Sequence, residues 1–214
     1  AAAERPEQAF YCAALACPDP HAATALLDVA RRLGYWSLDS QLLLVVRQGE
    51  AGAYEPLLGE TTALMRARPE LALSWALHGQ ALYDGGRYDD AVLALSKALE
   101  LGADSWRTYY DRALCRLGLG RPREVLADLD RAAALSAGNK WVAALRGEAH
   151  LTLEEYEPAL ASYDEAVRLG ENAPWTLQGR GEALRKLNRP LEAIPAFDAA
   201  LAETSPDRTR FRAR

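Results

Sequence analysis

The chain has 214 residues and a formal net charge of −5. This modest acidic balance argues against a nucleic-acid-binding protein, because such proteins carry a basic surface. No stretch of the sequence approaches the run of apolar residues that a transmembrane helix needs, so we expect a chain that does not span a membrane.

The first 71 residues predict two helix–turn–helix segments. Residues 4–37 read as a helix (PEQAFYCAALA), a turn rich in proline and a second helix (AATALLDVARRLG). Residues 38–71 follow the same outline, with Gly52 and Tyr54 at the connection between the helices. Val45 stands where later segments carry a small residue, so these two segments follow the pattern less closely than the rest.

From Ala72 onward the sequence repeats every 34 residues without an insertion. Small residues dominate three fixed places of the repeat, and a large apolar residue occupies a fourth. The three small places hold Gly79, Ala113, Gly147 and Gly181, then Ala91, Val125, Ala159 and Ala193, then Ala98, Ala132, Ala166 and Ala200; the large apolar place holds Leu95, Leu129, Tyr163 and Phe197.

Each repeat predicts two amphipathic helices joined by a short turn. Trp75, Leu82 and Leu95 follow helical spacing, while Gly85 and Gly86 interrupt the helical run. Small residues on facing helices allow the two axes to approach closely. We expect the tyrosine after each turn (Tyr54, Tyr88 and Tyr156) to lie against the turn of its own repeat. A single pair cannot bury its apolar face, so neighbouring repeats must stack.

A 34-residue period with this pattern resembles the tetratricopeptide repeat family. The resemblance implies an all-α fold, an α-solenoid of antiparallel helix pairs wound in a right-handed superhelix. We expect a single array over residues 4–207, of which the last four repeats match most clearly, and a basic tail or the start of a capping helix over residues 208–214. The repeats are 4–37, 38–71, 72–105, 106–139, 140–173 and 174–207.

A second recurrence concerns charge. Arginine recurs on the first helix of the last three repeats and aspartate on the second helix. Where the arginine is absent the aspartate tends to be absent too, as with His78 and Ser96. We interpret the recurrence as ion pairs between packed helices; the alternative is a basic stripe for an anionic ligand. The residues are Arg112, Arg146 and Arg180 with Asp130, Asp164 and Asp198.

Residues that carry catalytic or metal chemistry are sparse. The three histidines fall at different places of the repeat, and no serine or cysteine stands in a nucleophile motif. Glu148 and Glu182 occupy the same place in successive first helices; we favour two solvated charges over a pair of catalytic carboxylates. We therefore expect no metal, no cofactor and no enzymatic activity.

The family resemblance implies that the first helices line a concave groove that binds segments of other proteins. Some members of the family bind the C-terminal tails of heat-shock chaperones through lysine, asparagine and arginine. These residues are missing from the corresponding places here, so we do not expect such tails as ligands. Trp141 and Trp175 are candidates for binding in this groove. The alternative is that both tryptophans only pack between neighbouring helices. The groove candidates are Arg107, Tyr110, Trp141, Glu148, Trp175, Gln178, Glu182 and Arg185, preceded by Gln80 and Tyr83.

The sequence therefore predicts a non-catalytic scaffold that binds a peptide or helical segment of a partner protein. The alternative is the targeting or regulatory array of a larger enzyme or signalling protein. The last repeat keeps apolar residues at Ile194, Phe197 and Leu201, so we expect the natural chain to continue or this end to dock on a partner or a second copy.

The compartment and source are predicted from composition. No two of Cys12, Cys17 and Cys115 have the spacing of a metal-binding pair. This favours free thiols in a reducing compartment, the cytoplasm. The sequence begins without a methionine, so removal of a signal peptide and a periplasmic location stay open. Richness in alanine, leucine and arginine suggests a bacterial source.

Overall fold

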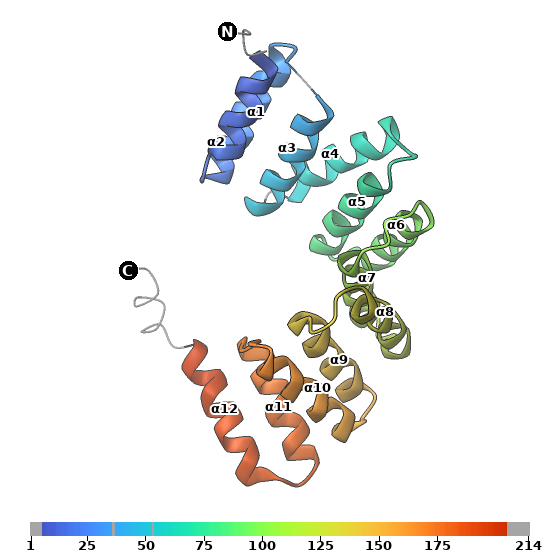
Figure 1. Ribbon diagram of the computed structural model, residues 1–214, viewed down its shortest axis with the longest axis vertical. Coiled ribbons are helices and arrows are strands. Elements are labelled where there is room, and N and C mark those ends of the chain that lie inside the picture. The colour runs from blue at the N-terminus through green and yellow to red at the C-terminus, as the bar shows by residue number, and fades with distance from the viewer. Residues whose placement is uncertain (1–5, 36, 53, 205–214) are drawn as a thin grey trace. The chain divides into compact units, whose positions relative to one another are not determined.

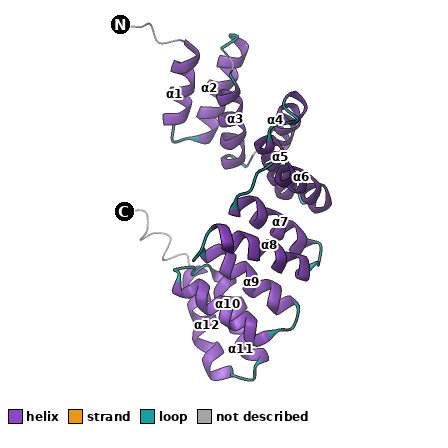
Figure 2. Ribbon diagram, turned by 45° about the vertical axis from the view of Figure 1, so that its right-hand side comes forward, coloured by secondary structure: helices purple, strands orange, loops and turns teal. Residues whose placement is uncertain are grey.

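The computed structural model describes residues 6–35, 37–52 and 54–204, and within them the chain forms twelve α-helices and no strand (Figures 1 and 2). The expected all-α fold is therefore confirmed. The helices are α1 (Pro6–Ala16), α2 (Pro20–Arg32), α3 (Leu38–Glu50), α4 (Tyr54–Ala67), α5 (Ala72–Asp84), α6 (Tyr88–Glu100), α7 (Trp106–Gly118), α8 (Pro122–Leu135), α9 (Lys140–Thr152), α10 (Tyr156–Arg168), α11 (Pro174–Lys186) and α12 (Pro190–Thr204).

The chain divides into two compact halves, an N-terminal half (Ala1–Ala103) and a C-terminal half (Asp104–Arg214). Each half contains three antiparallel helix pairs. A single array over residues 4–207 stays a prediction, and residues 208–214 lie outside the described part of the chain.

The starts of the first helices follow the sequence period. Ser105 and Asn139 precede α7 and α9, and their side chains accept backbone N–H groups of the first turn, from Thr108 at 3.2 Å and from Trp141 at 3.1 Å. These bonds satisfy donors that have no partner inside the helix. Pro174 begins α11, where its missing N–H removes no helical bond.

Packing within each pair depends on the small residues. A Cβ on Gly79 would lie 2.6 Å from Leu95, and one on Gly181 would lie 2.8 Å from Phe197. Both large side chains belong to the second helix of the same repeat, which agrees with the close approach of the two helices expected at these small residues. Tyr163 is enclosed from both sides, by Gly147 of its own repeat and by Gly179 of the next.

Two of the recurrent arginines form ion pairs between packed helices, as the sequence pattern predicted. Arg146 contacts Asp130 at 2.9 Å, and Arg180 contacts Asp164 at 2.6 Å. Each arginine therefore reaches back to the second helix of the preceding repeat, so the bonds join repeats rather than the two helices of one repeat. Because these guanidinium groups are paired, the alternative of a basic stripe loses support.

Arg112 takes a different partner. It contacts Asp128, two residues before Asp130 on α8, at 2.6 Å, and Arg116 contacts the same carboxylate at 2.7 Å. The side chain of Asp128 is 3% exposed. This buried three-residue cluster fastens α7 to α8.

Two of the tyrosines also lie against the following repeat. Tyr54 lies so close to Gly85, in the turn after α5, that a Cβ there would overlap its ring. Tyr156 lies near the end of α11, with Nζ of Lys186 5.9 Å from its ring centroid. The expectation that Tyr54 covers the turn of its own repeat is therefore wrong, because the ring packs against the next turn along the chain.

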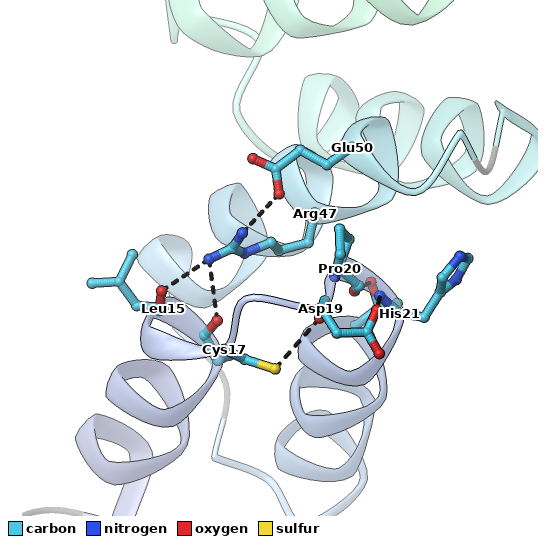
Figure 3. Close-up of polar contacts among 9 residues, drawn as sticks. Leu15, Cys17, Asp19, Pro20, His21, Arg47 and Glu50 are labelled. Carbon is cyan, nitrogen blue, oxygen red and sulfur yellow. Dashed lines mark hydrogen bonds and ion pairs between the residues drawn. The ribbon is translucent and has the colours of Figure 1, made fainter. Parts of the chain in front are cut away.

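In the N-terminal half, Arg47 of α3 holds the end of α1 (Figure 3). Its Nη2 donates to the carbonyl of Leu15 at 2.9 Å, and its Nη1 donates to Glu50 at 2.7 Å. The last carbonyls of a helix have no partner within that helix, so the guanidinium satisfies one of them. This contact fastens the first helix pair to the second.

From the second pair onward, the turn between the two helices of a pair contains one residue with positive φ, which is glycine in the second, third and fourth pairs. Glu154 (φ 60°) and Asn188 (φ 57°) occupy this place in the last two. Asparagine tolerates this left-handed conformation better than glutamate.

We expect Glu154→Gly to raise the free energy of unfolding by about 1 kcal/mol, because glycine relieves the strain of positive φ. Urea unfolding measures the change. Asn188→Gly is the matched control and should give a smaller gain. A loss of stability in Glu154→Gly would contradict the interpretation.

Candidate functional site

The first helices of the C-terminal half form one side of the stack. Successive first helices α7, α9 and α11 touch one another more extensively than the successive second helices α8, α10 and α12 do. A row of helices that pack closely lies on the inner side of a curved stack. The predicted groove residues from Arg107 to Arg185 all belong to this row.

An aromatic cluster occupies the beginning of α7 and α9. The rings of Trp106 and Trp141 stack with centroids 5.9 Å apart and an angle of 6°. Tyr110 meets Trp106 edge-on at 6.0 Å, and Nζ of Lys140 lies 5.2 Å from the centroid of Trp141. Trp141 is nevertheless 46% exposed. It therefore packs on a neighbouring helix and also offers surface to a ligand.

Trp175 stands one period further along than Trp141, at the beginning of α11. It is 41% exposed. Gln178 lies one turn later on the same helix and is exposed as well. Two partly exposed indoles thus stand at equivalent places of adjacent first helices.

The charged groove candidates are paired within the protein. Nε of Arg107 donates to Asp111 at 3.0 Å, and Arg185 pairs with Glu182 at 2.6 Å. Tyr163 Oη donates to Glu148 at 2.7 Å. Each of these carboxylates therefore has a partner from the protein, and the Glu182 side chain is also 34% exposed.

These partners also weaken the case for acid–base catalysis. The hydrogen bond from Arg185 lowers the pKa of Glu182, whereas a general acid needs a raised pKa. Burial raises the pKa of the Tyr163 hydroxyl, with the hydrogen bond to Glu148 adding to the effect. This hydroxyl therefore stays protonated and donates to Glu148.

Gln80 and Tyr83 belong to the N-terminal half. Gln80 lines a cavity of about 310 Å³ between α3 and α5, together with Val46, Leu77 and Asp84. The ring of Tyr83 lies 5.7 Å from that of Tyr88. The structure thus places Gln80 in a pocket of the N-terminal half and Tyr83 beside Tyr88. The remaining eight candidates lie on the first helices of the C-terminal half.

Two residues of the aromatic cluster were missed by the sequence analysis. Trp106 and Lys140 stand at the first place of their repeats, next to the second place that supplies Arg107, Trp141 and Trp175. The sequence feature that could have identified Trp106 is its place directly before the groove candidate Arg107.

Other kinds of site receive no support from the described residues. No group of three or more His, Cys, Asp or Glu side chains in residues 6–35, 37–52 and 54–204 is placed to hold a metal ion. Among the helices of this described part, none has both the length and the apolar character needed to cross a membrane.

The repeated helix pairs and the inner row of first helices define an all-α helical-repeat solenoid. A family model described as Tetratricopeptide repeat matches residues 76–140. Residues 76–140 therefore match the tetratricopeptide repeat family, and the other described helix pairs share its fold.

Solved structures share this fold at low sequence identity. A tetratricopeptide repeat protein from Parabacteroides merdae is 13% identical, with a TM-score of 0.75 over 94% of this chain and 80% of that one. YrrB, described as a TPR protein with an unusual peptide-binding site, is 14% identical, with a TM-score of 0.64 over 87% of this chain and 95% of that one.

A curated relative shows closer sequence similarity over a shorter segment. The DnaJ homolog subfamily C member 7 homolog of Schizosaccharomyces pombe is 36% identical over 83 residues, which is 37% of this chain. The match covers only 17% of the relative's own length.

Proposed function

We propose that the chain is a non-catalytic scaffold that binds a peptide or helical segment of a partner protein on the first helices of its C-terminal half. The observation that carries the proposal is the pair of partly exposed tryptophans, Trp141 and Trp175, at equivalent places of α9 and α11. Tryptophan is the side chain most enriched among residues that dominate binding energy at protein interfaces.

The surroundings of the tryptophans fit a polypeptide ligand. Tyr110 and Gln178 supply hydrogen-bonding groups near the indoles, and Arg107 is exposed beside them. An apolar anchor flanked by a few polar groups is the usual design of a peptide-binding groove. The YrrB structure, whose description names a peptide-binding site, supports the same use of the fold.

The second candidate is the array of a larger protein that carries the activity elsewhere. It is favoured by the yeast relative, in which the matching segment is a small part of the whole chain. Both candidates assign partner binding to this part of the protein. The free thiols Cys12, Cys17 and Cys115 favour the cytoplasm in either case.

We expect Trp141→Ala together with Trp175→Ala to weaken peptide binding by about ten-fold or more, since loss of an interface tryptophan costs upwards of about 1.4 kcal/mol. Ligands are first selected from a random peptide library on the purified chain, and isothermal titration calorimetry then gives the affinities.

Leu191→Ala is the matched control, because Leu191 is 83% exposed on the second helix α12 and should leave the affinity unchanged. The proposal would be contradicted if the wild type and the double tryptophan variant bound the peptide equally and Leu191→Ala bound it more weakly. That result would indicate that the binding surface lies on the second helices.

A further inference from the structure

The N-terminal half contains a cavity of about 350 Å³ that is lined by residues of α4, α5 and α6. Its apolar lining comes from Met65, Trp75, Leu82, Leu93 and Ala94. The side chain of Leu93 is 70% exposed, so the cavity opens to solvent beside it. Apolar cavities of about 150 Å³ already bind benzene. This cavity therefore has room for one aromatic side chain.

In the following repeat, the corresponding places carry two arginines beside an aromatic ring. Tyr109 stands at the place of Trp75. The guanidinium carbons of Arg112 and Arg131 each lie 5.8 Å from the centroid of the Tyr109 ring. Charged side chains of the protein itself therefore cover the aromatic residue in that repeat.

His78 and Lys97 stand at the places of these two arginines in the third repeat. The imidazole is shorter than an arginine side chain, and Nζ of Lys97 pairs with Glu100 at 2.9 Å. Arg87, which also lines the cavity, pairs with Asp90 at 2.6 Å. The charges around the cavity are thus balanced within the protein, which favours a neutral occupant.

His78 presents a hydrogen-bond acceptor to this cavity. The hydroxyl of Thr61 donates to the carbonyl of Leu57 at 2.9 Å, so it accepts from Nδ1–H of His78 at 3.1 Å. Burial lowers the pKa of His78, and the charge of Arg87 adds to the effect, so the ring is neutral at pH 7. A neutral imidazole with its proton on Nδ1 has a lone pair on Nε2. An occupant of the cavity can therefore donate a hydrogen bond to Nε2.

We propose that this cavity receives a tyrosine side chain of a partner protein, with the phenol hydroxyl donating to Nε2 of His78 and the ring packed against Leu82 and Leu93. A neutral aromatic ring suits the apolar lining and the balanced charges. The hydroxyl satisfies an acceptor that the occupant would otherwise remove from water at a cost. This surface is separate from the proposed binding at Trp141 and Trp175, and does not depend on it.

Peptide selection distinguishes this cavity from the tryptophan surface. A random peptide library is selected on the chain carrying Trp141→Ala and Trp175→Ala, and peptides that still bind after a further Leu93→Glu substitution are removed. Because Leu93 is exposed, glutamate there changes the cavity without entering the core. We expect tyrosine to be enriched at one position of the remaining peptides. Enrichment of other residues, or no enriched peptide, would overturn the proposal.

The hydrogen bond is measured by calorimetry with one such tyrosine peptide and its phenylalanine analogue. The analogue should bind about three- to ten-fold more weakly, the usual net effect of one hydrogen bond. His78→Leu should remove this difference, because leucine has no acceptor. Leu44 is buried at the same place of the second repeat, so the fold accommodates leucine there. An equal preference for tyrosine in His78→Leu, or no preference in the wild type, would overturn the proposal.

The location of the tyrosine peptide is checked through the indole Nε1–H signal of Trp75, which lines the cavity and should shift on binding. Leu93→Glu should weaken this binding by about ten-fold or more, the loss expected at a central interface residue. Leu73→Glu is the matched control, because Leu73 is 45% exposed on α5 and does not line the cavity. An unmoved Trp75 signal, or equal losses in both variants, would contradict the assigned cavity.

Discussion

Replacing Asp128 by alanine is expected to lower the free energy of unfolding by about 3–5 kcal/mol, the cost of removing one partner from a buried ion pair. The carboxylate accepts from Nε of Arg112 at 3.0 Å, from Nη2 of the same residue at 2.6 Å and from Nη1 of Arg116 at 2.7 Å. Both guanidinium groups are only 16% exposed, so the alanine variant leaves two largely desolvated charges without their shared partner.

Asp130→Ala is the matched control on the same helix. Its side chain is 74% exposed, so loss of its pair with Arg146 should cost less than about 1 kcal/mol. Urea unfolding of both variants measures the difference. Similar losses for Asp128→Ala and Asp130→Ala would contradict the structural importance of the buried cluster.

Gly179→Ala is expected to lower the free energy of unfolding by about 1–3 kcal/mol, the usual cost of overpacking a core. A Cβ at this position would overlap Oη and Cζ of Tyr163, which has 0% exposure and is also confined by Gly147. The ring therefore has no space to move into. The overpacking should outweigh the gain of about 1 kcal/mol that alanine brings to a helix.

Two controls isolate the clash from helix propensity. Gly59→Ala in α4 places its Cβ in open space and should instead stabilise the protein by about 1 kcal/mol. In a Tyr163→Leu background, Gly179→Ala should lose most of its cost, since leucine already stands at this place in Leu95 and Leu129. An unchanged cost in that background would contradict the clash.

The sequence predicted the fold well because the period itself marks where helices begin and end. The close approach of the two helices at Gly79 and Gly181 could be expected because these small residues recur in the repeat, whereas their contacts with Leu95 and Phe197 come from the structure. The enclosure of Tyr163 by Gly179 was not predicted, since it involves a residue of the following repeat.

The partners of the recurrent arginines could not be assigned from the sequence for a related reason. Asp130 and Asp164 stand almost equally far from Arg146 along the chain, one before it and one after it. A pattern that repeats at every period does not distinguish a bond within a repeat from a bond between repeats. The stacking of the helix pairs decides in favour of Asp130.

The candidate site was predicted in part. Trp141 and Trp175 are exposed on the expected first helices, but Glu148 is taken up by the hydroxyl of Tyr163. That bond depends on a tyrosine at a place where the two preceding repeats have leucine, so the general pattern gave no sign of it. Binding by these residues stays a proposal.

The most direct test of binding on the first helices of the C-terminal half is a titration of the ¹⁵N-labelled chain with a selected peptide, followed through the indole Nε1–H signals. Trp141 and Trp175 should shift on binding. Trp75 donates its indole N–H to the carbonyl of Pro69 at 2.8 Å in the N-terminal half and should stay unchanged. A shift of Trp75 with Trp141 and Trp175 unmoved would contradict the account.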